Sequence, residues 1–329
     1  MSGVELSVII PVYHSEATLS ELAERLLRVL DATGFVYEVI FVDDGSKDGS
    51  WPVVTELQAT HPDRIVAIEL MRNFGQHNAL MCGFRHARGE YIVTMDDDLQ
   101  NPPEEIPKLV AAIRGGSLDV VYGAIEKKAH SAFRNTGSRI VNAFYGMVFD
   151  TPVSVTSFRI VRREVIEKIT SYHPNFIYID GLLAWNTDRI GEVAVEHHAR
   201  AGPSGYSLGK LVLLAINLST NFSLLPLQVA SALGLVIAGF GMAAGVYYLA
   251  LTLLAKITVP GYASTIVAVL FLGGVQLIAL GIIGEYVGRL HMNVGHKPQY
   301  SVRSVLGSDA ETRVHAETAR ASVEDGTDA

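Results

Sequence analysis

The sequence predicts an α/β domain with a mostly parallel sheet, followed by an amphipathic interfacial helix and a two-helix transmembrane hairpin. Three observations lead to this prediction. Apolar strand segments alternate with amphipathic helical segments over the N-terminal part of the 329-residue chain. The strand segments are apolar on both faces, which is typical of parallel strands that helices cover on both sides. Nearer the C-terminus, two long apolar blocks contain no charged residue.

The strands and helices of the predicted domain alternate in a regular order. Predicted strands cover 6–10, 38–42, 65–70 and 91–95, and predicted helices cover 19–30, 51–59 and 76–86. Gly34 should end the first helix, because glycine readily takes the left-handed conformation that closes helices. Asn101 is expected to cap a fourth helix that runs to Gly115, with prolines and glutamates in its first turn. The polar clusters follow the strands, and ligands of such sheets bind beyond the carboxyl ends of the strands.

The two apolar blocks divide the chain into regions. The blocks, 227–254 and 259–284, each exceed the roughly 20 residues that span a bilayer core. Two buried core helices are the alternative, although soluble helices seldom run so far without a charge. The expected regions are a cytoplasmic domain at 1–206, an amphipathic juxtamembrane helix at 207–223, spans at about 227–254 and 262–284 within 224–286, a cytoplasmic juxtamembrane segment at 287–306, and a disordered acidic tail at 307–329.

Positive charge is unevenly distributed around the apolar blocks. Lys256 lies in the short linker between them, whereas Lys210 precedes the first block and Arg289, Lys297 and Arg303 follow the second. The positive-inside rule therefore places both ends of the chain in the cytoplasm.

Charge and cysteine content narrow the functional classes. The net charge of −8 does not indicate a nucleic-acid-binding protein, and half of it comes from 307–329, where six acidic residues stand against two arginines. Cys82 is the only cysteine, which excludes a disulfide framework or a cysteine metal site. Its expected role is that of a small core residue on a helix.

The most informative segment is an apolar strand that ends in three consecutive carboxylates, Asp96, Asp97 and Asp98. Alternate residues of an extended chain point the same way, so Asp96 and Asp98 should face one point. Two such carboxylates repel each other unless a cation lies between them, and no Lys or Arg is near in the sequence. The pair therefore predicts an oxygen-ligand site for Mg²⁺ or Mn²⁺, which would hold the diphosphate of a nucleotide-linked substrate.

Two further strand ends carry residues that suit a nucleotide. Asp43 and Asp44 precede Gly45, and adjacent acids there suit ribose hydroxyls or the edge of a base, with an ordinary Asx–Gly turn as the alternative. Arg72 ends the third strand just before a helix, where its charge and the free backbone N–H groups suit a phosphate. A capped helix start with a surface arginine is the alternative.

Basic residues gather beyond the predicted sheet, in a segment that contains Lys127, Lys128, Arg134, Ser138 and Arg139. In a membrane-anchored chain such cations can meet anionic lipid head groups, and a solvated basic face is the alternative. His77 and the pair His197–His198 have no carboxylate at ligand spacing. We therefore expect structural, hydrogen-bonded histidines rather than metal ligands.

Six short motifs occur in a characteristic order: PVY (11–13), VDDGS (42–46), RNFGQH (72–77), DLQNPPEE (98–105), GEYVGR (284–289) and KPQY (297–300). Their order and spacing resemble the family-2 glycosyltransferases that load a sugar onto a polyprenyl phosphate. The nearest types are dolichyl-phosphate mannose synthase and the bacterial undecaprenyl-phosphate sugar transferases, among them the formamido-arabinose type. The resemblance covers about residues 5–306.

The resemblance implies a GT-A fold, a divalent metal, Mg²⁺ or Mn²⁺, and a multi-pass protein of the bacterial inner membrane. The implied partners are a UDP-, GDP- or dTDP-linked sugar, a polyprenyl phosphate acceptor, the lipid bilayer and, as in relatives, a second copy of the chain. The expected reaction is inversion at the anomeric carbon by the lipid phosphate. A processive polysaccharide synthase and a membrane-tethered binding protein with a retired active site are the rival interpretations.

Site residues follow from the residues themselves and, by position, from this resemblance. The candidate catalytic residues are Asp96, Asp98 and Arg134, and the candidate metal ligands are Asp96, Asp98 and Gln100. The candidate donor-binding residues are Pro11, Tyr13, Asp43, Asp44, Arg72, Gln76, Asp96, Asp97 and Arg200. The candidate ligands of the acceptor phosphate are Lys128, Arg134, Ser138, Arg139 and Lys210.

Five positions depart from the family pattern. His14 and Ser15 stand where relatives often have Asn-Glu, and Asp97 replaces a small residue. Gly205 replaces a lysine, for which Lys210 is the candidate substitute. Ile125 stands where many relatives carry an arginine.

Overall fold

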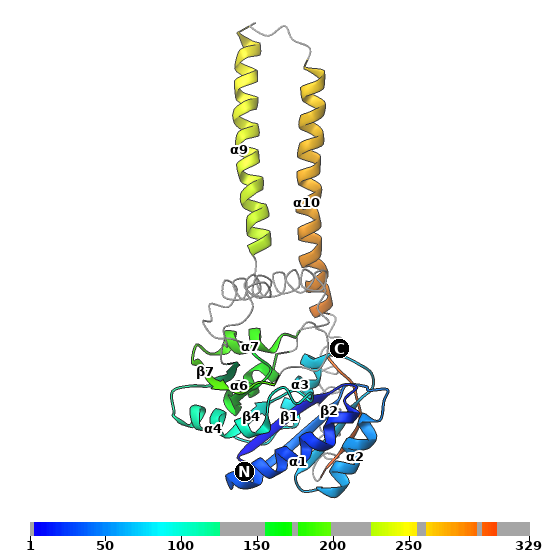
Figure 1. Cartoon of the computed structure of the whole chain (residues 1–329). Coiled ribbons are helices and arrows are strands. Elements are labelled where there is room, and N and C mark those ends of the chain that lie inside the picture. The colour runs from blue at the N-terminus through cyan, green and yellow to red at the C-terminus, as the bar shows by residue number, and fades with distance from the viewer. Residues whose placement is uncertain are drawn as a thin grey trace, which may run out of the picture. The chain divides into compact units, whose positions relative to one another are not determined.

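An eight-stranded sheet forms the centre of the structure, a computed structural model (Figure 1). The strand order is β7-β5-β6-β4-β1-β2-β3-β8. The strands are β1 (Leu6–Val12), β2 (Tyr37–Asp43), β3 (Ile65–Leu70), β4 (Tyr91–Thr94), β5 (Val120–Ile125), β6 (Arg159–Arg162), β7 (Ile190–Val195) and β8 (Val302–Leu306). The pairs β1–β2, β1–β4, β2–β3 and β5–β7 are parallel, whereas β6 and β8 run antiparallel to their neighbours. The predicted mostly parallel sheet is thus confirmed.

The structure describes residues 3–125, 155–172, 177–198, 225–254, 261–294 and 298–307. The chain forms two compact units. The first contains Met1–Ser204 together with Pro298–Ala329, and the second contains Gly205–Lys297. The predicted amphipathic helix at 207–223, the basic segment at 127–139 and the acidic tail from 308 onward lie outside the described residues.

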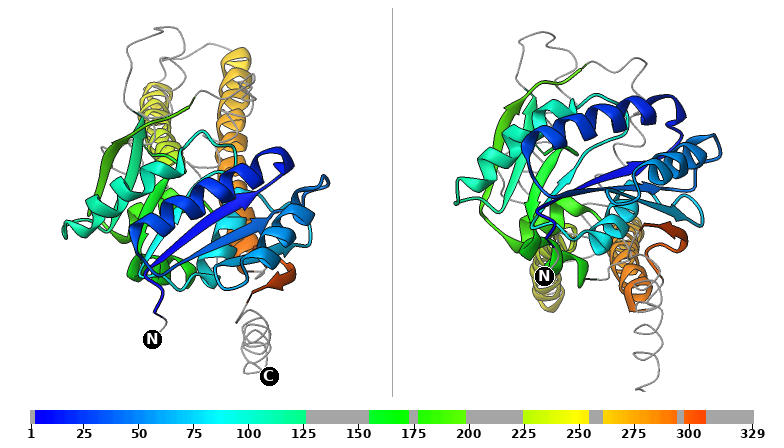
Figure 2. Two further views of the ribbon diagram at one scale, coloured as in Figure 1. Left: turned by 60° about the horizontal axis from the view of Figure 1, so that its bottom comes forward. Right: turned by 90° about the horizontal axis from the view of Figure 1, so that it is seen from below.

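Helices cover both faces of the sheet (Figure 2). Helices α1 (Glu16–Thr33), α2 (Ser50–Thr60) and α4 (Ile106–Arg114) share one hydrophobic cluster, and α3 (Gln76–His86), α6 (Arg163–Thr170) and α7 (Ile179–Asn186) share another. Every residue of β1 and β2 is buried, as expected for strands with helices on both sides. Because each buried aliphatic side chain contributes roughly 1.5–3 kcal/mol, these two clusters supply most of the driving force for folding.

The predicted element bounds agree closely with the structure where the hydrophobic period is strong. Strand 65–70 and helix 76–86 coincide with β3 and α3, and Gly34 closes α1 with a left-handed φ of 73°. The expected cap at Asn101 is wrong. Pro102 is extended because a residue before proline avoids helical angles, so a 3₁₀ turn, η1 (Pro103–Glu105), begins first and α4 follows at Ile106.

The strand β8 follows the second unit and returns to the edge of the sheet. It pairs antiparallel with β3, and Met71 N donates to Ser301 O at 2.9 Å. Arg85 on α3 donates to the Tyr300 hydroxyl at 3.1 Å and to Gln299 Oε1 at 3.3 Å. These contacts fasten the KPQY segment to the first unit.

The second unit contains two long helices, α9 (Leu225–Leu253) and α10 (Tyr262–Val294). Within the described residues, one stretch, Phe271–Gly288 of α10, is long and apolar enough to cross a bilayer, and a shorter apolar stretch, Leu227–Ala243, lies in α9. Helix α10 continues beyond the predicted end at Gly284. The predicted juxtamembrane segment 287–306 is therefore divided between the end of α10 and β8.

Candidate active site

Polar side chains gather where β1, β2, β3 and β4 end, at the edge of the sheet that the parallel arrangement predicts. One set of contacts joins the loop after β2 to the loop after β3. Both carboxylate oxygens of Asp44 accept backbone hydrogen bonds, from Phe74 N at 2.7 Å and from Gly75 N at 2.8 Å. Asp44 is buried and therefore binds these two loops together.

Gly45 is required for the same contact. Its φ of 67° is left-handed, and a Cβ atom at this position would lie 2.5 Å from the backbone carbon of Arg72. Only glycine permits the two loops to approach so closely. The DDGS motif is thus partly explained by packing.

Asp43 is different, because one of its oxygens has no partner. Asp43 Oδ2 accepts a hydrogen bond from Ser46 N at 3.1 Å, whereas the buried Oδ1 has none in the described part of the chain. Burial raises the pKa of this carboxyl group. An unpaired buried acceptor is costly, so Asp43 Oδ1 suits an N–H or O–H group of a bound nucleotide.

The loop after β1 is fixed by Asp97. Pro11 is buried within β1, whereas Tyr13 is 47% exposed and stacks on His14 at 4.2 Å between ring centroids. Asp97 Oδ2 accepts hydrogen bonds from Tyr13 N at 3.1 Å and from the Ser15 hydroxyl. Burial raises the pKa of Asp97 to about 6, against the lowering effect of the Ser15 hydrogen bond.

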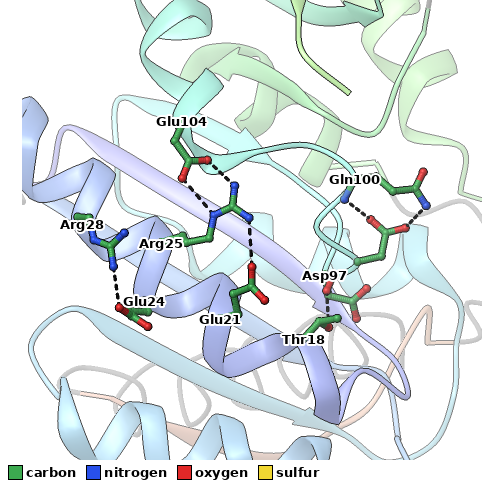
Figure 3. Close-up of polar contacts among 9 residues, drawn as sticks. Thr18, Glu21, Glu24, Arg25, Arg28, Asp97, Gln100 and Glu104 are labelled. Carbon is green, nitrogen blue, oxygen red and sulfur yellow. Dashed lines mark hydrogen bonds and ion pairs between the residues drawn. The ribbon is translucent and has the colours of Figure 1, made fainter. Parts of the chain in front are cut away.

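The loop after β4 that contains Asp96, Asp97 and Asp98 is called the acidic loop below. Helix α1 contacts it at two more points. The Thr18 hydroxyl donates to Asp97 O at 2.7 Å, and Arg25 forms a two-point contact with Glu104 at 3.1 and 2.8 Å (Figure 3). The loop that carries the acids is therefore anchored at both ends to one helix.

Asp96 and Asp98, the predicted metal pair, have only neutral hydrogen-bond donors. Asp96 accepts from Gln76 Nε2 at 2.7 Å and from the Ser157 hydroxyl at 2.5 Å. Asp98 accepts from Gln100 N at 3.1 Å and from Gln100 Nε2 at 2.7 Å. Burial raises the pKa of Asp96, and the nearby charge of Asp98 raises it further.

These residues fit a divalent cation that a diphosphate would share. Within the described residues, no Lys or Arg forms an ion pair with Asp96 or Asp98, and burial, together with the charge of Asp98, raises the pKa of Asp96. In the same part of the chain, no group of three or more His, Cys, Asp or Glu side chains converges there. Mg²⁺ commonly uses one or two carboxylates and takes its remaining ligands from water and substrate phosphates, which is what this arrangement offers.

Arg72 and the start of α3 border this loop. The exposed guanidinium of Arg72 lies 4.6 Å from the centroid of the Phe74 ring, and α3 begins four residues later at Gln76. Gln76 therefore connects the predicted phosphate-binding turn to Asp96. This agrees with the prediction that the two motifs belong to one site.

Several residues at or next to the site come from parts of the chain that contain none of the six sequence motifs. Ser157 precedes β6, Arg159 begins β6, Tyr122 lies in β5 and Asp180 lies in the first turn of α7. Arg159 is 1% exposed and pairs with Asp180. The sequence does contain one signal for it, an arginine inside the apolar run Phe158 to Val161, where a charge must find a buried partner.

His77 and His197 are partly buried, whereas His198 is exposed. His77 Nδ1 is buried without a hydrogen-bond partner in the described residues, and its ring lies edge-on to Tyr178 at 5.2 Å. Burial and, secondarily, the charge of Arg159 lower the pKa of His77 to about 4. His197 Nδ1 lies 3.2 Å from Asn101 Oδ1.

Six predicted site residues lie outside the described part of the chain: Lys128, Arg134, Ser138, Arg139, Arg200 and Lys210. Their assignments stay predictions.

A parallel α/β sheet with an acidic loop at its carboxyl edge defines a GT-A-like fold. The model of glycosyl transferase family 2 matches residues 7–170, and that of the GtrB C-terminal hairpin matches residues 225–290. The chain belongs to glycosyl transferase family 2 and is a glycosyltransferase.

Its curated relatives are similar over nearly the whole chain. The undecaprenyl-phosphate 4-deoxy-4-formamido-L-arabinose transferase of Shewanella sediminis (strain HAW-EB3) is 37% identical over 93% of this chain and 93% of its own. The protein of the same name from Edwardsiella ictaluri (strain 93-146) is 38% identical over 92% and 94%. Glucosyl-3-phosphoglycerate synthase from Mycobacterium tuberculosis, solved with Mn²⁺ and UDP-glucose, aligns over 67% of this chain and 78% of its own, with a TM-score of 0.48 and 19% identity, too low to inform the site.

Proposed function

We propose that this protein transfers 4-deoxy-4-formamido-L-arabinose, or a closely related sugar, from a nucleotide donor to undecaprenyl phosphate at the cytoplasmic face of the bacterial inner membrane. The relatives with that name match 93% and 92% of this chain. The observation that carries the proposal is the loop of Asp96 and Asp98, which has neutral hydrogen-bond donors and no protein counter-ion within the described residues. Such a loop suits the metal-bound diphosphate of an activated sugar.

The reaction is a single displacement. An oxygen of the acceptor phosphate attacks the anomeric carbon from the face opposite the leaving group, and the bond from that carbon to the diphosphate oxygen breaks. The phosphate is already anionic at neutral pH, so no strong general base is required. A bound Mg²⁺ or Mn²⁺ would neutralise charge on the departing nucleoside diphosphate.

The protein contributes position and charge. Asp43 and the loop at Tyr13 would hold the nucleoside, Asp96 and Asp98 with Gln100 would hold the metal, and Arg72 would contact the phosphates. The predicted acceptor residues, with Arg134 as the candidate catalytic cation, would hold the lipid phosphate in line with the anomeric carbon. Alignment of this kind can lower the activation barrier by several kcal/mol without a covalent intermediate between enzyme and sugar.

Chain connectivity supports a membrane hairpin. The chain up to Ser204 and the chain from Pro298 onward both belong to the first unit, and β7 and β8 lie in one sheet. A folded sheet cannot lie on both sides of a bilayer, so the chain between them crosses the bilayer an even number of times. Helices α9 and α10 supply two crossings and keep the active site beside the membrane that contains the acceptor.

The surfaces of the two helices suit lipid. Large apolar side chains on α9 and α10 are widely exposed, for example Leu235 at 77%, Phe240 at 75% and Leu277 at 71%. Exposed apolar area on this scale is rare on water-soluble proteins and indicates contact with membrane or protein.

The decisive experiment assays the full chain, reconstituted with undecaprenyl phosphate, against a panel of nucleotide-sugars, with mass spectrometry of the lipid product. We expect one sugar per lipid with UDP-4-deoxy-4-formamido-L-arabinose. A polymer would indicate a processive synthase, and no product from any donor would favour a binding protein.

The first prediction tests whether the acidic loop binds a metal ion. Asp98→Asn removes one charge at the metal site and should lower turnover by at least about 100-fold, because the leaving diphosphate loses its counter-charge. The exposed Asp63 is a matched control, and Asp63→Asn should retain activity. Chelation by EDTA should abolish turnover, and Mg²⁺ or Mn²⁺ should restore it. An active Asp98→Asn enzyme would contradict the metal role.

A further inference from the structure

A buried ion pair lies directly behind the acidic loop. Arg159 is 1% exposed, and its guanidinium pairs with Asp180, which also accepts a hydrogen bond from the Tyr122 hydroxyl at 2.9 Å. Burying such a pair costs several kcal/mol per ion, and well-packed apolar residues often stabilise a fold as well or better. A contribution to stability is therefore a poor reason for this pair.

Strand register places Arg159 beside the strand that carries the acids. Arg159 is opposite Thr94 on β4 and opposite Tyr122 on β5. Directly paired residues project from the same face of a sheet, so these three side chains form one row. Thr94 is the last residue of β4, and the acidic loop begins two residues later.

A chain of hydrogen bonds leads from Arg159 to Asp96. Arg159 Nε donates to Thr94 Oγ1 at 3.2 Å, and the Thr94 hydroxyl donates to Ser157 O at 2.6 Å. The Ser157 hydroxyl then donates to Asp96 Oδ2 at 2.5 Å. The other oxygen of Asp96 is held from α3 by Gln76. Thr94 and Ser157 each accept one of these hydrogen bonds and donate another, so a shift of the guanidinium displaces the carboxylate.

Resting on the proposed function, we propose that Arg159 is a positioning residue of the donor site: Asp180 and Tyr122 fix its guanidinium, and through Thr94 and Ser157 it sets the orientation of Asp96 for the metal-bound diphosphate. Arg159 acts through other residues and does not itself touch the donor.

This assignment gives Asp180 a defined role. A carboxylate at the start of a helix beyond the metal pair could be taken for a general base. Its Oδ1 instead accepts hydrogen bonds from both Arg159 and Tyr122. The Asp180 carboxylate therefore serves as the counter-ion of Arg159. This role agrees with an acceptor phosphate that needs no general base.

The test measures binding as well as activity. The full chain in detergent or nanodiscs is titrated with Mn²⁺ and UDP, and bound Mn²⁺ is followed by electron paramagnetic resonance, with thermal unfolding in parallel. The informative variants are Ser157→Ala and the double variant Arg159→Met/Asp180→Leu, which replaces the ion pair by apolar residues of similar size. Removal of groups that orient a metal ligand typically costs roughly 10- to 100-fold in metal affinity, and we expect that loss in both.

The control lies in the same strand. Arg162 ends β6, donates to Leu118 O at 3.0 Å and has no hydrogen-bonded link to Asp96 in the described residues. Arg162→Met should lower the melting temperature and leave Mn²⁺ affinity unchanged. The double variant should instead keep a melting temperature near that of the wild type and bind Mn²⁺ weakly.

The outcomes separate the two proposals. A wild-type protein that binds Mn²⁺ with UDP, together with a folded double variant that binds it equally well, would overturn the positioning role of Arg159 and leave the proposed function intact. A wild-type protein that binds neither Mn²⁺ nor UDP would overturn the proposed function and this inference with it.

Discussion

The three consecutive acids of the loop after β4 have different surroundings. Asp96 contacts α3 and the residue before β6, Asp98 contacts Gln100, and Asp97 turns toward the loop after β1. The alternation of side chains in an extended chain correctly separates Asp97 from the other two. The positive φ of Leu99, at 59°, then ends the extended run.

Asp97 also explains one departure from the family pattern. A small residue would be expected there, and this chain has an acid that binds Tyr13 N and the Ser15 hydroxyl. Ser15 is itself a departure, so the two unusual residues contact each other.

The second prediction concerns pH and His77. The folded-state pKa of about 4 lies below the usual 6.5, so between these values the unfolded chain binds the proton that the folded protein does not. Folding stability should therefore fall as pH decreases across this interval, by on the order of 2 kcal/mol after allowance for partial exposure of the ring. His77→Gln lacks this titration and should lose less melting temperature on acidification.

The comparison is made by thermal unfolding at several pH values. His198 is exposed, and His198→Gln provides the same substitution without a buried ring. If His77→Gln and the wild type lose melting temperature in parallel as pH falls, the neutral, buried state of His77 is refuted.

At the scale of elements, local pattern predicted the N-terminal strands and helices and the two long apolar helices, but not β6 or β8. The strands β1 to β4 and the helices between them follow from hydrophobic period and glycine signals. Strand β6 is four residues long and contains Arg159 and Arg162, so its burial depends on partners in β4, β5 and α7 that only the folded chain supplies. Strand β8 follows α10, where no local signal indicates that the chain rejoins the sheet.

The same distinction applies to the site. Asp43, Asp44, Gln76, Asp96 and Asp98 stand at strand ends, and parallel topology brings strand ends together. Ser157, Arg159 and Asp180 reach the site through antiparallel pairing and helix packing over long sequence separations. Sequence periodicity contains no information about such register.

The third prediction concerns β8. The guanidinium carbon of Arg85 lies 5.4 Å from the centroid of the Tyr300 ring, and Arg85 also donates a hydrogen bond to the Tyr300 hydroxyl. Tyr300→Ala removes both the ring and the hydroxyl. The loss of about 1–2 kcal/mol should loosen β8 from β3 and speed amide exchange there by roughly tenfold or more. Hydrogen–deuterium exchange over Ile65–Leu70 and at Met71 measures this directly.

Tyr172 is the matched control, because it is a tyrosine of the same unit that is 49% exposed. Tyr172→Ala should leave exchange at β3 unchanged. Since Met71 precedes Arg72, looser pairing should also raise the KM for the donor. Unaltered exchange in Tyr300→Ala would show that the KPQY segment does not hold the sheet edge.

At the scale of the whole molecule, the sheet constrains the membrane topology that we propose. Strands on both sides of the helical unit in sequence belong to one sheet, so both ends of that unit must face the same compartment. The distribution of positive charge independently assigns this compartment to the cytoplasm. Two kinds of evidence, covalent connectivity and charge, thus converge on an even number of crossings.

The fourth prediction follows from this topology and uses cysteine labelling in intact cells. The single native cysteine, Cys82, is fully buried, so background labelling should be low. A cysteine at Lys256, in the linker between the helices, should react with a membrane-impermeant maleimide added outside. The variants Asp63→Cys and Asp309→Cys lie before and after the helices in sequence. Under the proposed topology, both should react only after lysis. Labelling of Asp309→Cys from outside, with Asp63→Cys protected, would require an odd number of crossings and is incompatible with β8 lying in the same sheet as β3.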